Sequence, residues 1–182
     1  MSQEPDPSFR SHETGKPFVH CISCGLGLDD PDLPYLVAKS FHREECVFEY
    51  AICEHCRAHL SEEFSQESRE RLAQFFDQHI DLQRRSRLLA FGPVAQPWIA
   101  RCAACDTPRD EMEHYSLGAV LLGAEMLFDP YPLCLCGQCE QKIQETISKQ
   151  TRDIWDDFVE THFDGPPAHV LDLPVAGKPM IL

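Results

Sequence analysis

The sequence has no apolar run near the roughly 20 residues that a membrane-spanning helix requires. Its start, MSQEPDPSFRSHETGK, also lacks the apolar core of a secretory signal. We therefore expect a cytoplasmic protein whose residues 1–16 form a mobile polar tail. Hydrophobic residues make up 43% of the 182 residues, so most of the chain should fold.

Positive charge is also scarce, with 16 basic against 30 acidic residues and a formal net charge of −14. Such a field repels phosphate backbones and anionic lipids alike. Arg84, Arg85 and Arg87 form the only basic cluster, which a solvated helix end explains. The charge therefore argues against nucleic acid or a membrane as partner.

Familiar catalytic motifs are missing too: there is no H-E-x-x-H, G-x-S-x-G or phosphate loop. His79 and His162 recur at equivalent places, which favours imidazoles packed beside the core over a duplicated catalytic role. His42, His55 and His59 lie near the first cysteine cluster, where hydrogen bonding around a metal or plain exposure explains them.

Cysteine, in contrast, is abundant, with ten residues, eight of them in four C-x-x-C pairs. A C-x-x-C turn brings two sulfurs to one point, and a second turn completes the tetrahedral shell that zinc prefers. The intervals of 28 residues between Cys24 and Cys53, and 30 between Cys105 and Cys136, leave room for a hairpin. We predict two structural zinc sites, formed by Cys21, Cys24, Cys53 and Cys56 and by Cys102, Cys105, Cys136 and Cys139.

Other uses of these cysteines stay open at this point. Disulfides are disfavoured in a reducing compartment, and a thioredoxin-like dithiol does not explain four pairs. Iron is possible because the spacing also resembles rubredoxin, although long helices after the second pairs fit that class poorly. The first pairs could also share one ion, which a tandem duplication argues against. Cys46 and Cys134 are interpreted as small buried hydrophobic residues.

A tandem duplication is visible in the spacing. The first pairs are offset by 81 residues and the second pairs by 83, and at the latter offset Ser65 matches Ser148 and Phe75 matches Phe158. We predict strands at Tyr35–Lys39, Cys46–Ile52, Tyr115–Leu122 and Glu125–Leu133. Pro130 and Pro132 should confine the last strand to an edge or end it early. A long amphipathic helix follows each second pair, with a possible kink where Ser65 or Ser148 caps a fresh helix.

The order of elements in each half resembles the treble-clef class of zinc fingers. A turn with the first cysteine pair (the knuckle) is followed by a hairpin and by a helix that bears the second pair. The resemblance covers residues 18–80 and 99–163 and implies an α+β fold of two tandem zinc units packed as a pseudo-symmetric pair. It also implies that each second pair lies at a helix N-terminus. We expect repeats at 17–81 and 99–164, a linker at 82–98 and an extended tail at 165–182.

Four-cysteine shells leave no open position for substrate, so the metals should stabilise the fold. We expect a non-enzymatic module that binds another protein through an exposed apolar patch between the repeats or at residues 179–182. A nucleic-acid-binding zinc finger is one alternative. A degenerate nuclease, whose activity would depend on a further open metal and on His42 or His114, is another. Cys53→Ser or Cys136→Ser should release one zinc and unfold mainly its own repeat.

Overall fold

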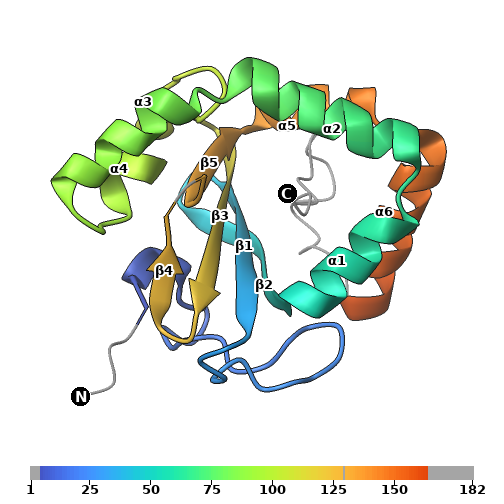
Figure 1. Cartoon of the computed structure of the whole chain (residues 1–182), viewed down its shortest axis with the longest axis horizontal. Coiled ribbons are helices and arrows are strands. Elements are labelled where there is room, and N and C mark those ends of the chain that lie inside the picture. Colours follow the sequence, from blue (N-terminus) through green and yellow to red (C-terminus); the bar gives the residue numbers. More distant parts are fainter. Residues whose placement is uncertain (1–4, 129, 164–182) are drawn as a thin grey trace.

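A five-stranded antiparallel sheet forms the centre of the molecule (Figure 1). The structure is a computed structural model that describes residues 5–128 and 130–163. The strands run in the order β2-β1-β3-β4, and β5 also pairs with β3. They are β1 (Pro34–His42), β2 (Glu45–Cys53), β3 (His114–Leu122), β4 (Glu125–Leu127) and β5 (Leu133–Cys136). The described part is therefore α+β, as predicted.

The pairing of β1 with β3 joins the two halves of the chain in one sheet. Nine residue pairs form this antiparallel ladder, from Pro34 opposite Leu122 to His42 opposite His114. Because β1 also pairs with β2, it is a central strand, and residues 35–41 are all buried. The two halves therefore share a core, and their hairpins do not form separate sheets.

The strand predicted at Glu125–Leu133 is divided in two. Strand β4 ends at Leu127, and pairing resumes in β5 at Leu133. Pro130 and Pro132 lie between the two strands and have no backbone N–H to donate to a ladder. The early end expected from these prolines is confirmed.

Two shorter helices replace the long helix predicted in each half. The first half has α1 (Glu54–Glu63) and α2 (Gln66–His79), and the second has α5 (Gly137–Thr146) and α6 (Lys149–His162). Ser65 and Ser148 are the N-caps of α2 and α6, and their side chains accept hydrogen bonds from Ser68 N and Thr151 N. The backbone is thus extended where the kink was expected, which ends one helix and begins the next.

The N-termini of α2 and α6 meet in a cluster of four hydroxyl groups, from Ser65, Ser68, Ser148 and Thr151. Ser65 N donates to Thr151 Oγ1 over 3.1 Å, and Ser148 N donates to Ser68 Oγ over 2.8 Å. The two cap hydroxyls are 3.0 Å apart. Each helix therefore supplies the group that satisfies the cap N–H of the other helix, a reciprocal form of the capping box.

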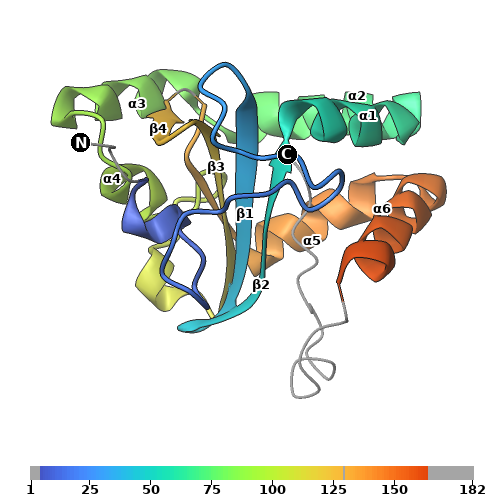
Figure 2. The same ribbon diagram turned by 90° about the horizontal axis from the view of Figure 1, so that it is seen from below.

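Residues 82–98, expected as a linker, contain α3 (Leu82–Ser86), the 3-10 helix η2 (Arg87–Phe91) and most of α4 (Gln96–Ile99). Trp98 and Ile99 are 1% and 0% exposed, so this segment contributes to the core. The Arg85 guanidinium lies 5.0 Å from the Trp98 ring centroid and donates to the carbonyls of Pro130 and Pro132. Figures 1 and 2 show α3 and α4 on one side of the sheet and α1, α2, α5 and α6 on the other.

Part of the segment expected to be a mobile tail is packed against β1 and β2. Phe9, in the 3-10 helix η1 (Pro7–Phe9), is 1% exposed. Lys39 Nζ donates to the carbonyl of Arg10 over 2.6 Å, and Ser11 Oγ donates to Glu49 over 2.8 Å. The polar composition of this segment thus reflects anchoring hydrogen bonds, at least from residue 5 onward. The predicted tail at 165–182 lies outside the described residues.

Among the residues that the structure describes, no helix combines the length and the apolar character needed to cross a membrane.

Candidate metal centres

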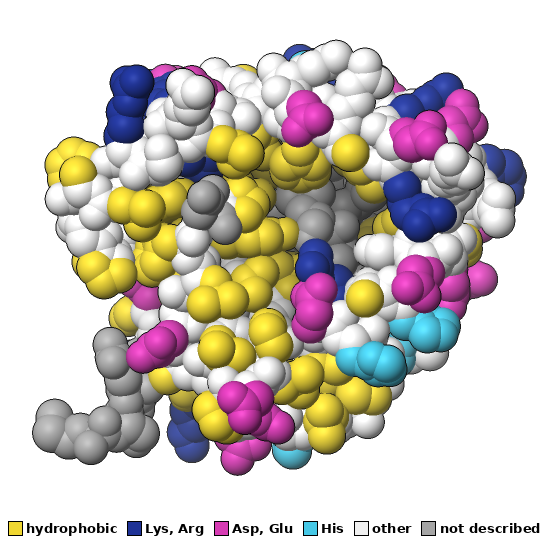
Figure 3. All heavy atoms as spheres, viewed as in Figure 1, with side chains coloured by type: hydrophobic (Ala, Val, Ile, Leu, Met, Phe, Trp, Pro, Cys, Tyr) yellow, Lys and Arg dark blue, Asp and Glu magenta, His cyan; other side chains and the backbone are white. Residues whose placement is uncertain are grey.

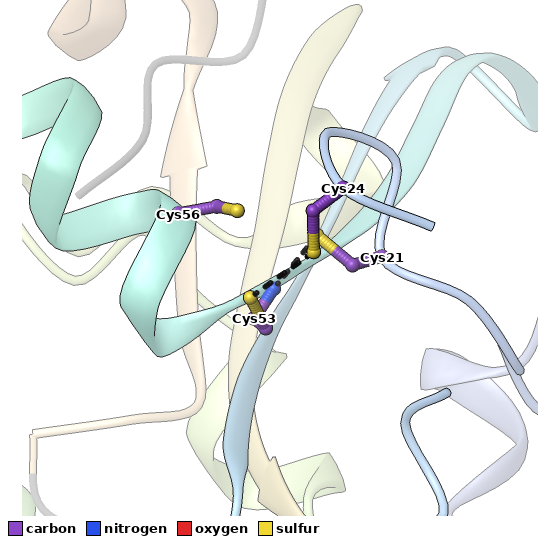
Figure 4. A group of neighbouring side chains, drawn as sticks. All are labelled: Cys21, Cys24, Cys53 and Cys56. Carbon is purple, nitrogen blue, oxygen red and sulfur yellow. Dashed lines mark hydrogen bonds between the residues drawn. The ribbon is translucent and has the colours of Figure 1, made fainter. Parts of the chain in front are cut away.

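The first cysteine cluster lies between a loop turn and the start of α1. Cys21 and Cys24 come from the turn, Cys53 is the N-cap of α1, and Cys56 lies in its first turn. Their four sulfurs all lie within 4.8 Å of one another. Figure 4 shows the side chains pointing toward a common centre.

The second cluster repeats this arrangement in the other half of the chain. Cys102 and Cys105 come from a turn, and Cys136 is the N-cap of α5, with Cys139 in the first turn. These sulfurs also lie within 4.8 Å of one another. The eight predicted ligands thus form two groups of four that could hold metal ions, each group within one half of the chain. This grouping excludes the interleaved arrangement.

Each knuckle turn needs one residue with a left-handed backbone. Gly25 takes this position in the first turn at φ 71°, and Asp106 takes it in the second at φ 64°. The N–H of each donates to the carbonyl of the first cysteine of its pair, over 2.9 Å in both turns. Glycine adopts this backbone freely, whereas Asp106 is held by ion pairs with Arg84 and Arg101, at 2.6 and 3.1 Å.

A short backbone contact places each knuckle beside the helix that completes its cluster. Ile22 N donates to the carbonyl of Ala51 over 2.8 Å, and Ala103 N donates to that of Cys134 over 2.7 Å. Cys134 is 0% exposed and stands two residues before a ligand, as Ala51 does. A small side chain is required at this place, which agrees with the interpretation of Cys134 as a buried hydrophobic residue.

The sulfur geometry fits a tetrahedral metal and not a disulfide. Cys24 Sγ and Cys53 Sγ are 3.9 Å apart, and Cys105 Sγ and Cys136 Sγ are 3.6 Å apart. Zinc–sulfur bonds of about 2.3 Å in a tetrahedron place the sulfurs about 3.8 Å apart. A disulfide requires about 2.05 Å, and all ten cysteines are free thiols.

Backbone donors favour thiolate at both centres. Cys53 N donates to Cys21 Sγ and Cys136 N donates to Cys102 Sγ, each over 3.4 Å. Burial raises the pKa of Cys21, but backbone N–H groups, that of Cys53 first, outweigh it and lower the pKa to about 7.

The four thiols of one centre also compete for protons. Hydrogen bonds with Cys102 and Cys139 lower the pKa of Cys136 to about 3, and the contacts of Cys139 with Cys102 and Cys136 raise the pKa of Cys139. Four thiolates cannot be packed together without a counter-charge. A dication at the centre would supply that charge, so that all four groups could be thiolates.

Cys46 belongs to neither cluster. It lies in β2, where its Sγ donates to the carbonyl of Phe48 over 3.5 Å. Burial, followed by the nearby Glu49 carboxylate, raises the pKa of Cys46 to about 11. A thiol with that pKa is a poor nucleophile, which argues against a redox role.

The two recurring histidines each pack on a phenylalanine one helical turn earlier. The His79 ring lies 4.4 Å from that of Phe75, and the His162 ring lies 4.7 Å from that of Phe158, between centroids. His162 is half-buried, as a packing role requires, whereas His79 is exposed and contacts the buried Phe75 from the surface.

A third group of possible metal ligands was not assembled from the sequence. His42, Glu113 and His114 each offer one ligand atom, and the three atoms lie within 4.8 Å of one another. The sequence analysis linked His42 and His114 to a further open metal only in the nuclease alternative, and Glu113 was missed. The residues come together because the last residue of β1 pairs with the first residue of β3.

No family model matches the chain, and no curated protein or solved structure shows significant similarity to it.

Proposed function

We propose that the chain is a non-enzymatic, zinc-stabilised adaptor that binds another protein in the cytoplasm. The observation that carries this proposal is the pair of closed four-cysteine centres within one shared sheet. Four thiolate ligands fill a tetrahedral shell, so neither ion would have a position for water or substrate. The free thiols fit a reducing compartment.

Zinc is the proposed metal because the ligands are four thiolates from two turns, each completed at a helix N-terminus. Iron accepts the same ligands. The helices α1 and α5, which begin at Cys53 and Cys136, are foreign to the rubredoxin arrangement. The colour of the purified protein separates the two metals, since zinc–thiolate sites are colourless.

We further propose that the halves are treble-clef-like units related by a pseudo-two-fold axis. Strands β1 and β3 have nine residues each and start 80 positions apart, at Pro34 and His114. Their ladder centres on Ala38 opposite Gly118, which are themselves 80 positions apart. The reciprocal capping of α2 and α6 has the same symmetry, because each helix accepts the cap N–H of the other.

The proposed contact surface is an apolar patch formed by Leu89, Phe91, Val94 and Leu127. These side chains are 45%, 70%, 46% and 41% exposed, and three of them come from the segment that joins the predicted repeats. Figure 3 shows hydrophobic side chains gathered over the α3–α4 region and β4. Apolar surface of this kind is typical of docking sites, and the net charge of −14 favours a partner with a basic rim.

The test compares the wild-type protein with Phe91→Ser/Val94→Ser in pull-downs from the native host, quantified by mass spectrometry. We expect at least one protein to be retained by the wild type and depleted about tenfold or more on the double variant. Leu26→Ser is the control, because Leu26 is 52% exposed and lies in the first knuckle. If every retained protein binds the double variant as well as the control, the patch is not the contact surface.

The nucleic-acid alternative receives no support from the basic cluster. Arg85 is only 6% exposed, and Arg84 forms an ion pair with Asp106 at 2.6 Å. Two of the three arginines in this cluster are thus occupied within the protein. The nuclease alternative has one observation in its favour, the histidine–glutamate cluster at the end of the β1–β3 ladder.

A further inference from the structure

We propose that His42, Glu113 and His114 form a third metal site, distinct from the cysteine centres, that binds a zinc-like divalent cation with one coordination position left open. The three residues supply two imidazole nitrogens and a carboxylate oxygen. This is a ligand set that zinc uses where the fourth position holds water or an exchangeable anion.

The spacing of the two imidazoles is that of two ligands on one ion. His42 and His114 are opposite residues on β1 and β3, and their Nδ1 atoms are 3.3 Å apart. Zinc–nitrogen bonds of 2.0–2.1 Å in a tetrahedron require a separation of about 3.3 Å. The rings are tilted by 31° with centroids 4.5 Å apart, and one ring nitrogen of each histidine and a carboxylate oxygen of Glu113 lie within 4.8 Å of one another.

Glu113 is held in reach of this point by its backbone. Arg43, in the turn between β1 and β2, donates its N–H to the carbonyl of Glu113 over 2.7 Å. The Glu113 carboxylate also meets the Arg43 guanidinium at 3.3 Å, with the two side chains 61% and 73% exposed. An exposed ion pair of this kind contributes little, so the carboxylate can turn to a metal at small cost.

Metal binding is one explanation of the contact between the two imidazoles, because a neutral ring nitrogen is a metal ligand. The alternative explanation of the contact is a hydrogen bond between two neutral rings, and the experiment below separates the two.

The β1–β3 ladder itself does not require histidines. At its other end, Pro34 pairs with Leu122, and neither residue is a ligand. The arrangement of ligands is therefore specific to one end of the ladder.

A cavity of ≈ 1100 Å³ adjoins the cluster. Its lining includes Arg43 and Tyr115, which are next in sequence to His42 and His114. Three arginines and three acidic residues line the cavity, so it offers space beside the cluster without a preference for anions. An open metal position accepts water or a small anion such as phosphate, for which this space is large enough.

The test is a Co²⁺ titration of the full-length protein that retains its cysteine-bound metal after desalting. We expect one equivalent of Co²⁺ to bind with visible d–d absorption and without sulfur-to-cobalt charge transfer, and phosphate to change that spectrum. His114→Ala and the milder Glu113→Gln should each weaken binding about tenfold or more while the cysteine-bound metal content stays unchanged.

His59→Ala is the matched control, because His59 Nδ1 also lies 3.2 Å from a carboxylate oxygen, that of Glu63, but with no third ligand. This variant should bind Co²⁺ as the wild type does. Equal Co²⁺ affinity in the wild type and both ligand variants would overturn the proposal. So would absorption that shows cobalt bound only to thiolates.

Discussion

At the scale of the residue, the ligand cysteines differ in how far they are enclosed. Cys24 and Cys105 are exposed, whereas Cys21 and Cys102, the first members of the same pairs, are buried and accept backbone hydrogen bonds. The exposed pair members are therefore the sulfurs that a chelator or an oxidant reaches first. The enclosed ones hold the metal against dissociation.

Cys46 should react far more slowly than an ordinary thiol. With a pKa of about 11, its thiolate fraction at pH 8 is lower than that of a free cysteine by a factor of about 200. We expect alkylation by iodoacetamide, followed by peptide mass spectrometry, to be at least about a hundredfold slower than for a model peptide. The rate should rise about tenfold per pH unit, because only the thiolate attacks. A rate that levels off above about pH 9 would show an ordinary thiol.

The sequence predicted a structural feature where only one residue type can form it. It did not predict a feature that several residue types can form. The spacing of eight cysteines indicated both centres. Asp106 carried no comparable indication, because most aspartates do not adopt the left-handed backbone that it has in the second turn. Glu113 was missed because an isolated acidic residue has no pattern.

At the scale of the element, the ends of α2 and α6 depend on each other. Ser68 and Thr151 are both 0% exposed, and each accepts the cap N–H of the opposite helix. Removing either acceptor leaves a half-buried backbone donor without its partner. The N-terminal turns of two helices from different halves are thus stabilised as one unit.

We therefore expect Ser68→Ala or Thr151→Val to lower the free energy of unfolding by about 1–3 kcal/mol, measured by urea denaturation. The double variant should lose less than the sum, since the four hydroxyls contact one another. Ser86→Ala is the control, because Ser86 is exposed and donates only within its own segment, to the carbonyl of Gln83. Strict additivity would mean that the two caps are independent.

The sequence showed where the two helix caps lie. It did not show that each cap N–H donates to a side chain of the opposite helix. Ser65 and Ser148 stand before apolar helical stripes, as N-caps do. A capping box is read from residues three apart, and here the partner groups are 86 and 80 residues away. The prediction of one long helix after each second cysteine pair was wrong. Phe64 and Ile147, where the backbone is extended, are apolar and continue the helical pattern of the sequence.

At the scale of the whole molecule, the shared sheet changes what loss of one metal should do. The unit around Cys53 was expected to unfold mainly by itself in Cys53→Ser. Strand β2 leads directly into Cys53, β1 lies between β2 and β3, and nine residue pairs connect β1 to β3. Disorder in one half therefore exposes the core of the other.

We expect Cys53→Ser and Cys136→Ser each to retain one cysteine-bound metal per chain in place of two, measured by elemental analysis after desalting. Each should also show one cooperative unfolding transition at lower denaturant, since a structural site contributes on the order of 10 kcal/mol. A chelator should likewise unfold the wild type in a single step followed by circular dichroism. Two separate transitions in either variant would show that the halves fold independently, and two retained metals would refute the ligand assignment.

The sequence did not indicate which strands pair with each other in the sheet. The apolar run that ends at Leu122 indicates a strand at Tyr115–Leu122, but it does not show which strand lies beside it. The ladder of β1 with β3 follows from packing of the two halves, and it alone brings His42 to His114. Sequence periodicity thus predicted most strands, while the sheet and the third ligand cluster required the structure.

Two connections between the halves have a consequence for behaviour in different ionic strengths. Both are built from groups without formal charge: backbone amides in the β1–β3 ladder and hydroxyls between α2 and α6. Dissolved ions screen charges and leave such bonds almost unaffected. The surplus of 14 negative charges is, in contrast, a source of self-repulsion that ions reduce. The halves therefore stay joined in dilute and concentrated buffer alike, and added electrolyte favours the compact form.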